Sequence, residues 1–245
     1  MGKITVITGG TSGIGRGIAE KILAESAKED RIFVTYGHDE KKAAVFRDSL
    51  PEEKKSQVIL MKADMSSYDE MMAFVEELKK RADHIDWLVS NAGISTYAKY
   101  EDYSFEEWTR IVNTNLSVPV FMVKELRPML VEGGSVLFTG SYAGQQAYSS
   151  SLVYGVTKAA IHFLTKSLVK EFEPKKIRVN AIAPGFIETS WHKNRTPESY
   201  ERINRKVALH RFGTVEEVAD MAYAVLSNGY MNGSIVDIHG GYDYF

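Results

Sequence analysis

The chain has 245 residues, of which 44% are hydrophobic and 25% charged, and its formal net charge is −2 at pH 7. These values are ordinary for one globular α/β domain, and the small negative charge gives no reason to expect nucleic acid or an anionic membrane as a partner. The chain has no cysteine, which excludes disulfides, thiol catalysis and cysteine-ligated metals.

Short β-branched runs alternate with longer helical patterns along almost the whole chain. In chain order, the predicted strands cover residues 4–8, 32–36, 58–61, 85–90, 135–140, 177–182 and 234–238. The predicted helices follow the first strand, begin near residues 39 and 67, and cover about 105–126 and 148–172. Apolar strands that alternate with helices indicate a parallel sheet with helices on both faces, so we predict one doubly wound α/β domain over residues 1–245.

The segment at about 186–209 departs from this alternation. It is polar, holds aromatic residues and contains a proline. We expect an insertion in the substrate lobe that acts as a mobile lid, and an ordinary surface loop and helix is the alternative.

A glycine-rich turn, Thr8-Gly-Gly-Thr-Ser-Gly-Ile-Gly15, lies between the first strand and the first helix. Parallel α/β proteins bind ligands at the carboxyl ends of their strands, and a helix N-terminus favours a pyrophosphate there. Arg16 and Gly17 stand where a P-loop needs Lys and Ser or Thr, so an NTPase is not expected. The form present is T-G-x3-G-x-G, and a turn that only needs positive φ is the alternative.

Tyr154 and Lys158 are four residues apart in a predicted helix, which places both side chains on one face. Reduction of a carbonyl by hydride transfer develops an alkoxide that needs a proton, and a phenol of pKa ~10 is a weak match at pH 7. A nearby ammonium favours the phenolate, which makes Tyr154 a candidate acid/base. Ser141, at the end of the fifth predicted strand, is a candidate for holding the carbonyl oxygen. Asn115, inside the preceding helix, is a candidate for ordering a water that links Lys158 to solvent.

Together these motifs resemble the short-chain dehydrogenase/reductase family, and within it 3-oxoacyl-carrier-protein reductases. The resemblance covers nearly the whole chain, with Ser90 replacing the first Asn of the family's N-N-A-G segment. It implies a Rossmann-like fold, an NAD(P)(H)-dependent oxidoreductase that interconverts a ketone or aldehyde with an alcohol, and a tetrad of Asn115, Ser141, Tyr154 and Lys158. It also implies a set of cofactor-binding residues: Gly9, Thr11, Ser12, Gly13, Ile14, Tyr36, His38, Asp64, Met65, Asn91, Ala92, Gly93, Lys158, Pro184, Gly185, Ile187 and Thr189.

The choice between the two nicotinamide cofactors depends on the end of the second strand. Family members that prefer NAD carry an acid where Tyr36 stands, and such a carboxylate would repel the 2′-phosphate of NADP. Ser12 occupies a position that often holds Arg or Lys, so the usual basic contact is also missing; His38, Lys41 or Lys42 would substitute for it. NADP(H) is favoured over NAD(H) by a narrow margin.

The substrate is expected to be a small carbonyl or alcohol compound. The candidate substrate lobe consists of Thr96, Tyr97, Gln146, Tyr148, Phe186, Trp191 and His192, with ordinary packing as the alternative for each aromatic residue. Lys175 matches a basic position that holds the acidic carrier in 3-oxoacyl-carrier-protein reductases, but Glu132 reverses the charge of the other. This reversal counts against a carrier-bound substrate, and sugars, sterols and simple ketones stay open.

Several expectations concern partners. The resemblance implies a homo-oligomer, either a tetramer or a dimer, with the aromatic end at 242–245 as a candidate interface. No signal segment or membrane-spanning apolar stretch is found, so a cytoplasmic location without membrane contact is expected. The six histidines are scattered, and no metal site is expected. A catalytically silent, NAD(P)-binding regulator is the alternative function, and it predicts a damaged tetrad.

Overall fold

The computed structural model describes residues 2–147 and 151–244, and over these residues the sheet has seven strands, all parallel, in the order β3-β2-β1-β4-β5-β6-β7. The strands are β1 (Ile4–Ile7), β2 (Arg31–Tyr36), β3 (Val58–Lys62), β4 (Ile85–Ser90), β5 (Leu130–Thr139), β6 (Arg178–Pro184) and β7 (Ile235–Ile238). The order reverses between β1 and β4, the place where open α/β sheets bind their ligands.

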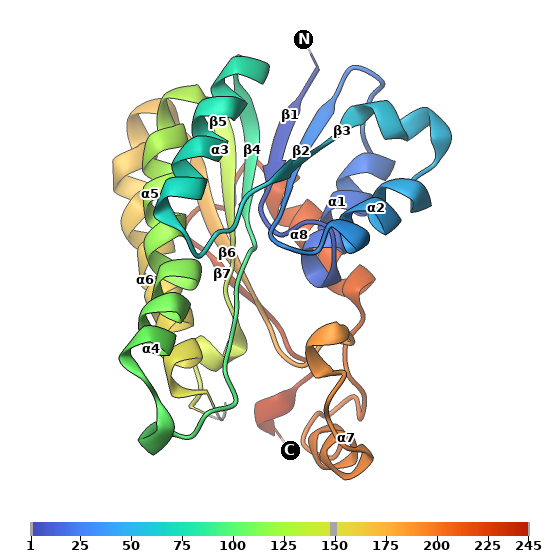
Figure 1. Ribbon diagram of the computed structural model, residues 1–245, viewed down its shortest axis with the longest axis vertical. Helices are drawn as coiled ribbons and strands as arrows, with labels where there is room; N and C mark the ends of the chain where they lie inside the picture. Colours follow the sequence, from blue (N-terminus) through green and yellow to red (C-terminus); the bar gives the residue numbers. More distant parts are fainter. Residues whose placement is uncertain (1, 148–150, 245) are drawn as a thin grey trace.

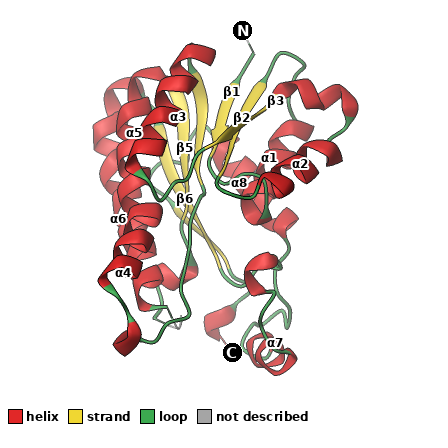
Figure 2. Cartoon of the chain, viewed as in Figure 1, coloured by secondary structure: helices red, strands yellow, loops and turns green. Residues whose placement is uncertain are grey.

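Helices cover both faces of the sheet (Figure 1). On one side lie α1 (Gly13–Ala24), α2 (Glu40–Ser49) and α8 (Val215–Ser227), and on the other lie α3 (Tyr68–Arg81), α4 (Phe105–Val112), α5 (Val118–Leu126) and α6 (Leu152–Phe172). Helix α7 (Pro197–Asn204) lies apart from both layers, near the C-terminus (Figure 1). Figure 2 shows the strands as one layer between the two helical layers. The predicted Rossmann-like, doubly wound fold is therefore confirmed.

The two faces of the sheet are both apolar because the strands are buried on both sides. Phe33 packs with the helices of the α3 and α6 layer, whereas its neighbour Val34 packs with the α1 and α8 layer. This alternation is the period of two that a pleated strand imposes. On the second side α1 and α8 approach closely, since a Cβ at Gly17 would lie 2.2 Å from Val215 Cγ1.

Helix starts follow the hydrogen-bonding rules for free N–H groups. Ser67 caps α3 by accepting from the Glu70 N–H at 3.2 Å. Thr214 and Glu217 form a reciprocal capping box at the start of α8. Thr196 caps α7, and Pro197 follows it at the first helical position, where no N–H is needed.

Several predicted elements differ from the structure. Strand β5 begins at Leu130 instead of Ser135, because Gly133 and Gly134 interrupt the β-branched pattern without ending the strand. The helix predicted over 105–126 is divided by a π-helical turn, Asn113–Ser117. Helix α8 was not predicted, and α6 begins at Leu152, whereas 148–150 lie outside the described residues.

Candidate active site

The turn between β1 and α1 forms a backbone cradle at one end of a cleft. Gly9, with φ +63°, and Gly13, with φ +54°, have left-handed backbone conformations that favour glycine. A Cβ at Gly15 would lie 2.3 Å from Asn91 Nδ2, so a side chain does not fit there. Ser12 makes no side-chain cap to α1 among the described residues, which leaves the first N–H groups of the helix available to a ligand. This arrangement fits a pyrophosphate.

Asn91 fixes this cradle to the ends of three neighbouring strands. Its side-chain amide donates to the carbonyl oxygens of Thr8 and Gly9 at 3.1 and 3.2 Å, and its Oδ1 accepts from the Thr139 hydroxyl at 3.1 Å. The Thr8 hydroxyl in turn accepts from the Asn91 and Ala92 N–H groups, each at 3.0 Å. Thr8 and Thr139 were not predicted as site residues, although each follows or ends a strand at this edge.

A second part of the cleft lies at the ends of β2 and β3. His38 Nε2 lies 3.0 Å from Asp64 Oδ2, and the His38 side chain is 79% exposed. Burial raises the pKa of Asp64, but hydrogen bonds from Ser66 and the charge of His38 outweigh it, so the pKa lies below its ordinary value. Met65 beside Asp64 is buried. The pair places one exposed imidazole beside the Asp64 carboxylate, which lines this end of the cleft.

The cleft has a volume of about 610 Å³. Most of the predicted cofactor residues line it: Gly9, Ser12, Gly13, Ile14, Asp64, Met65, Asn91, Ala92, Gly93, Lys158, Pro184, Gly185, Ile187 and Thr189. The lining residues do not include Thr11, which is buried, or Tyr36 and His38, although Gly37 between these two does line the cleft. The cleft thus brings together segments from the ends of six strands.

Asn115 is buried within the π-helical turn between α4 and α5. Its Nδ2 donates to the Ile94 carbonyl at 2.9 Å and to the Thr157 hydroxyl at 3.1 Å, and its Oδ1 accepts from the Ile94 N–H at 2.9 Å. π-Helical turns occur often at functional sites. Here the turn lets one side chain join the loop after β4 to α6. The ordering of a water by Asn115 stays a prediction.

Ser141, Tyr154 and Lys158 meet beyond the end of β5. The Tyr154 and Ser141 side chains are hydrogen-bonded to each other. Lys158 Nζ lies 5.5 Å from the centre of the Tyr154 ring and donates to the Thr139 carbonyl at 2.6 Å. Helix α6 therefore presents both of its candidate catalytic side chains to the same wall of the cleft, as the spacing of four predicted.

Burial dominates the electrostatics of this group. It raises the pKa of Tyr154, and the hydrogen bond with Ser141 offsets only part of that rise. It also lowers the pKa of Lys158 to about 8. The sequence led us to expect the opposite direction for Tyr154. The difference arises because both groups are removed from water and the ammonium is directed at the Thr139 carbonyl.

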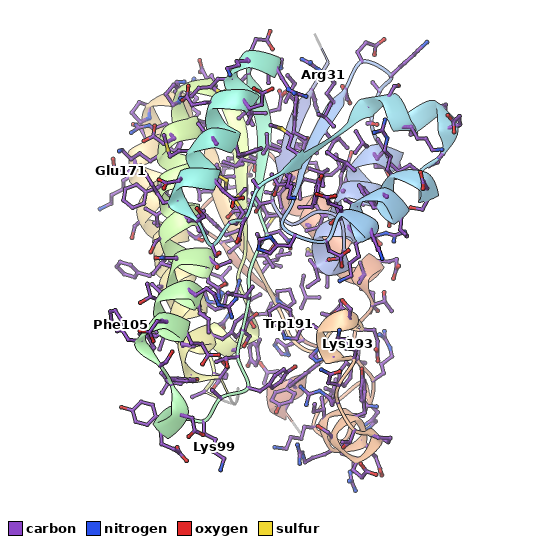
Figure 3. All side chains as sticks on the ribbon, in the orientation of Figure 1. Arg31, Lys99, Phe105, Glu171, Trp191 and Lys193 are labelled. Atoms are coloured by element: carbon purple, nitrogen blue, oxygen red, sulfur yellow. The ribbon has the colours of Figure 1, made fainter. Side chains whose placement is uncertain are left out.

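Aromatic residues form the other end of the cleft. The Trp191 ring lies 5.8 Å from the Tyr154 ring, and the Tyr97 hydroxyl donates to the Trp191 carbonyl at 3.1 Å. Figure 3 shows Trp191 between the α6 side and the α7 side of the cleft. The predicted substrate residues that line the cleft are Thr96, Tyr97, Phe186, Trp191 and His192.

Two other predicted substrate residues do not join this group. Gln146 is exposed and is not among the residues that line the cleft, so its role stays a prediction, and Tyr148 lies outside the described residues. At the aromatic end of the chain Tyr244 is 81% exposed, and the interface expected there stays a prediction. Tyr242 lines the cleft and packs on Phe186 with ring centres 5.4 Å apart.

Three basic residues of the cleft wall were not predicted. Arg195, Arg202 and Lys206 line the cleft from the segment 186–209, which we call the lid segment. Their positions, together with Ser199, are spaced by three or four residues, and this helical period was the signal that could have placed them on one side. They leave the substrate end of the cleft positively charged.

Neither a metal centre nor a membrane span is found within the described residues. Over 2–147 and 151–244, no group of three or more His, Cys, Asp or Glu side chains is arranged to hold a metal ion. None of the helices in these ranges is both long and apolar enough to cross a membrane.

Known proteins share this architecture. The sequence profile of the family described as enoyl-(acyl carrier protein) reductase matches residues 9–243. The 3-oxoacyl-[acyl-carrier-protein] reductase of Chlamydia trachomatis is 34% identical over 245 residues, which cover 98% of this chain and 97% of that protein. A short-chain dehydrogenase/reductase of Brucella melitensis, described as a glucose/ribitol dehydrogenase, has a structure with a TM-score of 0.89 and 29% identity, covering 98% of this chain and 96% of that one. The NADP active-site complex of Pseudomonas aeruginosa RhlG has a TM-score of 0.88 and 28% identity, with the same coverage of 98% and 96%. The chain therefore belongs to the short-chain dehydrogenase/reductase family and is an NAD(P)-dependent oxidoreductase that interconverts carbonyl and alcohol groups.

Proposed function

We propose that the chain reduces a small carbonyl compound with NADPH and that Tyr154 is the proton donor. One observation carries this proposal: the Tyr154 hydroxyl, hydrogen-bonded to Ser141, lies in the same cleft as the glycine cradle that fits a pyrophosphate. A cofactor bound along the cleft would then pass from the cradle to this hydroxyl.

Residues of the chain bind the carbonyl oxygen, donate the proton and supply the positive charge that the reaction needs. When bound, the nicotinamide supplies the hydride. The Ser141 hydroxyl holds the carbonyl oxygen, and Tyr154 donates the proton that the developing alkoxide needs. Lys158, whose pKa is lowered to about 8, supplies positive charge beside the phenol as the proton leaves. Asn115 keeps α6 and the loop after β4 in register by its bonds to Ile94 and Thr157.

The preference for NADPH is proposed from the edge of the cleft at β2. The residue at position 36 is a tyrosine and not an acid, and the exposed His38 imidazole lies 3.0 Å from Asp64, where a ring N–H can donate to a 2′-phosphate. The Pseudomonas aeruginosa relative forms a complex with NADP, in keeping with this preference. A His38→Asn variant is expected to bind NADPH more weakly and NADH equally well in fluorescence titrations. An equal loss for both cofactors would contradict the role of His38.

The lid segment is proposed to close over the substrate. It packs through a small aromatic cluster in which the Phe186 and Phe212 rings lie 5.5 Å apart, and Tyr97 ties it to the opposite wall through the Trp191 carbonyl. A single hydrogen bond across the mouth of a cleft can open and re-form without disturbing the core.

A substrate carried by an acyl carrier protein is a second candidate, since the relative from Chlamydia trachomatis is named for that activity. The charges at the expected docking position oppose it. Lys175 donates to the carbonyl oxygens of Pro128 and Leu130 at 3.2 and 3.1 Å, and Glu132 is paired with Lys176 at 2.9 Å. A free small carbonyl compound is therefore the preferred substrate.

We also propose a homo-oligomer, with the outer face of α4 and α6 as its interface. Phe105 on α4 is 79% exposed and Phe163 on α6 is 75% exposed. Leu152 and Val156, which precede Phe163 on α6, are exposed as well. Exposed apolar side chains of this size are typical of a surface that a second copy covers. Sedimentation of the wild type and of a Phe105→Ser/Phe163→Ser variant tests the interface: the variant should shift to a smaller species.

The decisive experiment is Tyr154→Phe. The variant should bind NADPH as the wild type does, because only the hydroxyl is lost, and its turnover on any reducible ketone should fall by a factor of about 100 or more. Near-normal turnover would refute the role of Tyr154. Tight NADPH binding by the wild type, without turnover on any carbonyl in a broad screen, would instead support a catalytically silent regulator.

A further inference from the structure

One wall of the cleft carries three cationic side chains. Arg195, Arg202 and Lys206 all line the cleft, and all come from the lid segment or from α7 within it. The acid among the described lining residues is Asp64, which lies at the other end of the cleft, beside His38. A chain with a net charge of −2 therefore concentrates unopposed positive charge at its substrate end.

The two guanidinium groups are held together by a neutral residue. Arg195 Nη1 donates to Ser199 Oγ at 2.9 Å, and Arg202 Nη2 approaches the same oxygen at 3.4 Å. Among the described residues neither guanidinium has a carboxylate partner within ion-pair distance, whereas the neighbouring Arg205 faces Glu201 at 3.9 Å. Two like charges beside one hydroxyl repel each other, and an anion bound between them would remove that repulsion.

Arg195 is the better anchored of the two. Its guanidinium lies over the Phe186 ring, 5.6 Å from the ring centre, so its orientation is fixed by packing. Its Nε is buried without a hydrogen-bond partner among the described residues. A buried donor of this kind is unfavourable unless a ligand satisfies it.

The pyrophosphate of the cofactor already has a place at the start of α1. We therefore infer that the substrate itself carries an anionic group, a carboxylate or a phosphate, and that Arg195, Arg202 and Lys206 bind it while the carbonyl lies at Tyr154. This inference rests on the proposed function. It narrows the substrate class to oxo acids or oxo phosphates, and it disfavours sterols and other uncharged ketones.

The test compares matched pairs of compounds that differ in charge. Acetoacetate is set against methyl acetoacetate for the carboxylate, and dihydroxyacetone phosphate against dihydroxyacetone for the phosphate. The wild type should show a higher kcat/KM for the charged member of one pair. In an Arg195→Gln/Arg202→Gln variant, kcat/KM for the charged member should fall by a factor of about ten or more beyond any fall for the neutral member. Arg205→Gln is the matched control and should behave as the wild type.

A binding measurement makes the result independent of turnover. Calorimetric titration of NADP⁺-saturated protein with acetoacetate and with dihydroxyacetone phosphate should show binding of at least one of them, which the double variant weakens by the same factor. Titration of both proteins with NADP⁺ itself should give equal affinities, which also shows that the variant is folded.

Three results would overturn the inference. In the first, the charged compounds bind the wild type and the double variant with equal affinity, or bind neither. In the second, kcat/KM of the double variant falls by the same factor for the neutral and the charged compounds. In the third, the affinity of the double variant for NADP⁺ falls by the same factor, which would mean that the arginines bind the cofactor. Reduction of neutral ketones without any preference for charge would refute the inference and leave the proposed function standing. Binding of the charged compounds without reduction of any carbonyl would refute the proposed function alone.

Discussion

Replacement of Lys158 by Met should stabilise the fold while it abolishes turnover. The side chain is only 4% exposed, and burial lowers its pKa from 10.5 to about 8. At pH 7 the folded protein must hold this buried ammonium, and the difference in pKa corresponds to about 3 kcal/mol of destabilisation. Lys158→Met also removes the hydrogen bond to the Thr139 carbonyl, which contributes about 1 kcal/mol. The expected net gain is about 2 kcal/mol in the free energy of unfolding.

The pH dependence of this gain identifies its cause. The folded-state pKa lies below the unfolded one, so the destabilisation is fully present below about pH 8 and disappears as the pH rises towards 10.5. Urea unfolding of both proteins at pH 7 and at about pH 10 should therefore show the advantage of the variant shrinking by about 2 kcal/mol.

Lys166→Met, at an exposed position on the same helix, is the control, and it should change neither stability nor its pH dependence. An Lys158→Met variant that is less stable than the wild type at pH 7, or whose advantage does not change with pH, would refute the reasoning. It would mean that the ammonium is better solvated than its burial indicates.

Three further outcomes are expected. Gly17→Ala should destabilise the fold by about 1–3 kcal/mol in urea unfolding, because its Cβ would lie 2.2 Å from Val215 Cγ1; an unchanged midpoint would show that α1 and α8 can separate freely. Tyr97→Phe removes the hydrogen bond to the Trp191 carbonyl and should raise KM more than it lowers kcat, whereas unchanged steady-state kinetics would exclude a role for this contact in closure. Hydrogen bonds from Arg211 and the Thr214 N–H lower the pKa of Glu217 to about 2, so the stability that its carboxylate contributes should be lost as the pH falls from about 4.5 towards 2. In Glu217→Gln the free energy of unfolding should depend less on pH over that range.

The fold could be predicted from the sequence because strands such as β1, β4 and β6 are buried on both faces and read as apolar runs. The strand and helix boundaries predicted from the alternation are wrong where the residue types do not show the backbone conformation. Gly133 and Gly134 lie inside β5 and hid its first residues. The π-helical turn was hidden for a different reason, since its residues have ordinary helical propensities and only the hydrogen bonds distinguish it.

The candidate site was predictable to the extent that it lies at strand ends. Parallel strands bring their carboxyl ends to one edge, and Ser141, after β5, and Asn91, after β4, both line the cleft there. The direction of the Tyr154 pKa was not predictable, because burial cannot be read from a spacing. The spacing of Arg195, Arg202 and Lys206 could be read from the sequence, but a spacing does not show which side of a segment faces a cleft. The cytoplasmic location stays a prediction.

The π-helical turn at Asn113–Ser117 also limits how the chain can change in length. A π turn uses one more residue than an α turn, and each residue of an α-helix advances about 100° around its axis. In a continuous α-helix one extra residue would rotate α5 relative to α4 by about 100°, but the wide turn absorbs that residue, so both helices keep their apolar faces towards the core. Deletion of one residue here would therefore leave Met122 and Leu126 in the core, but it would remove the wide turn that lets Asn115 reach Ile94. A related chain with a one-residue gap at this point should fold and lack the Asn115 contact.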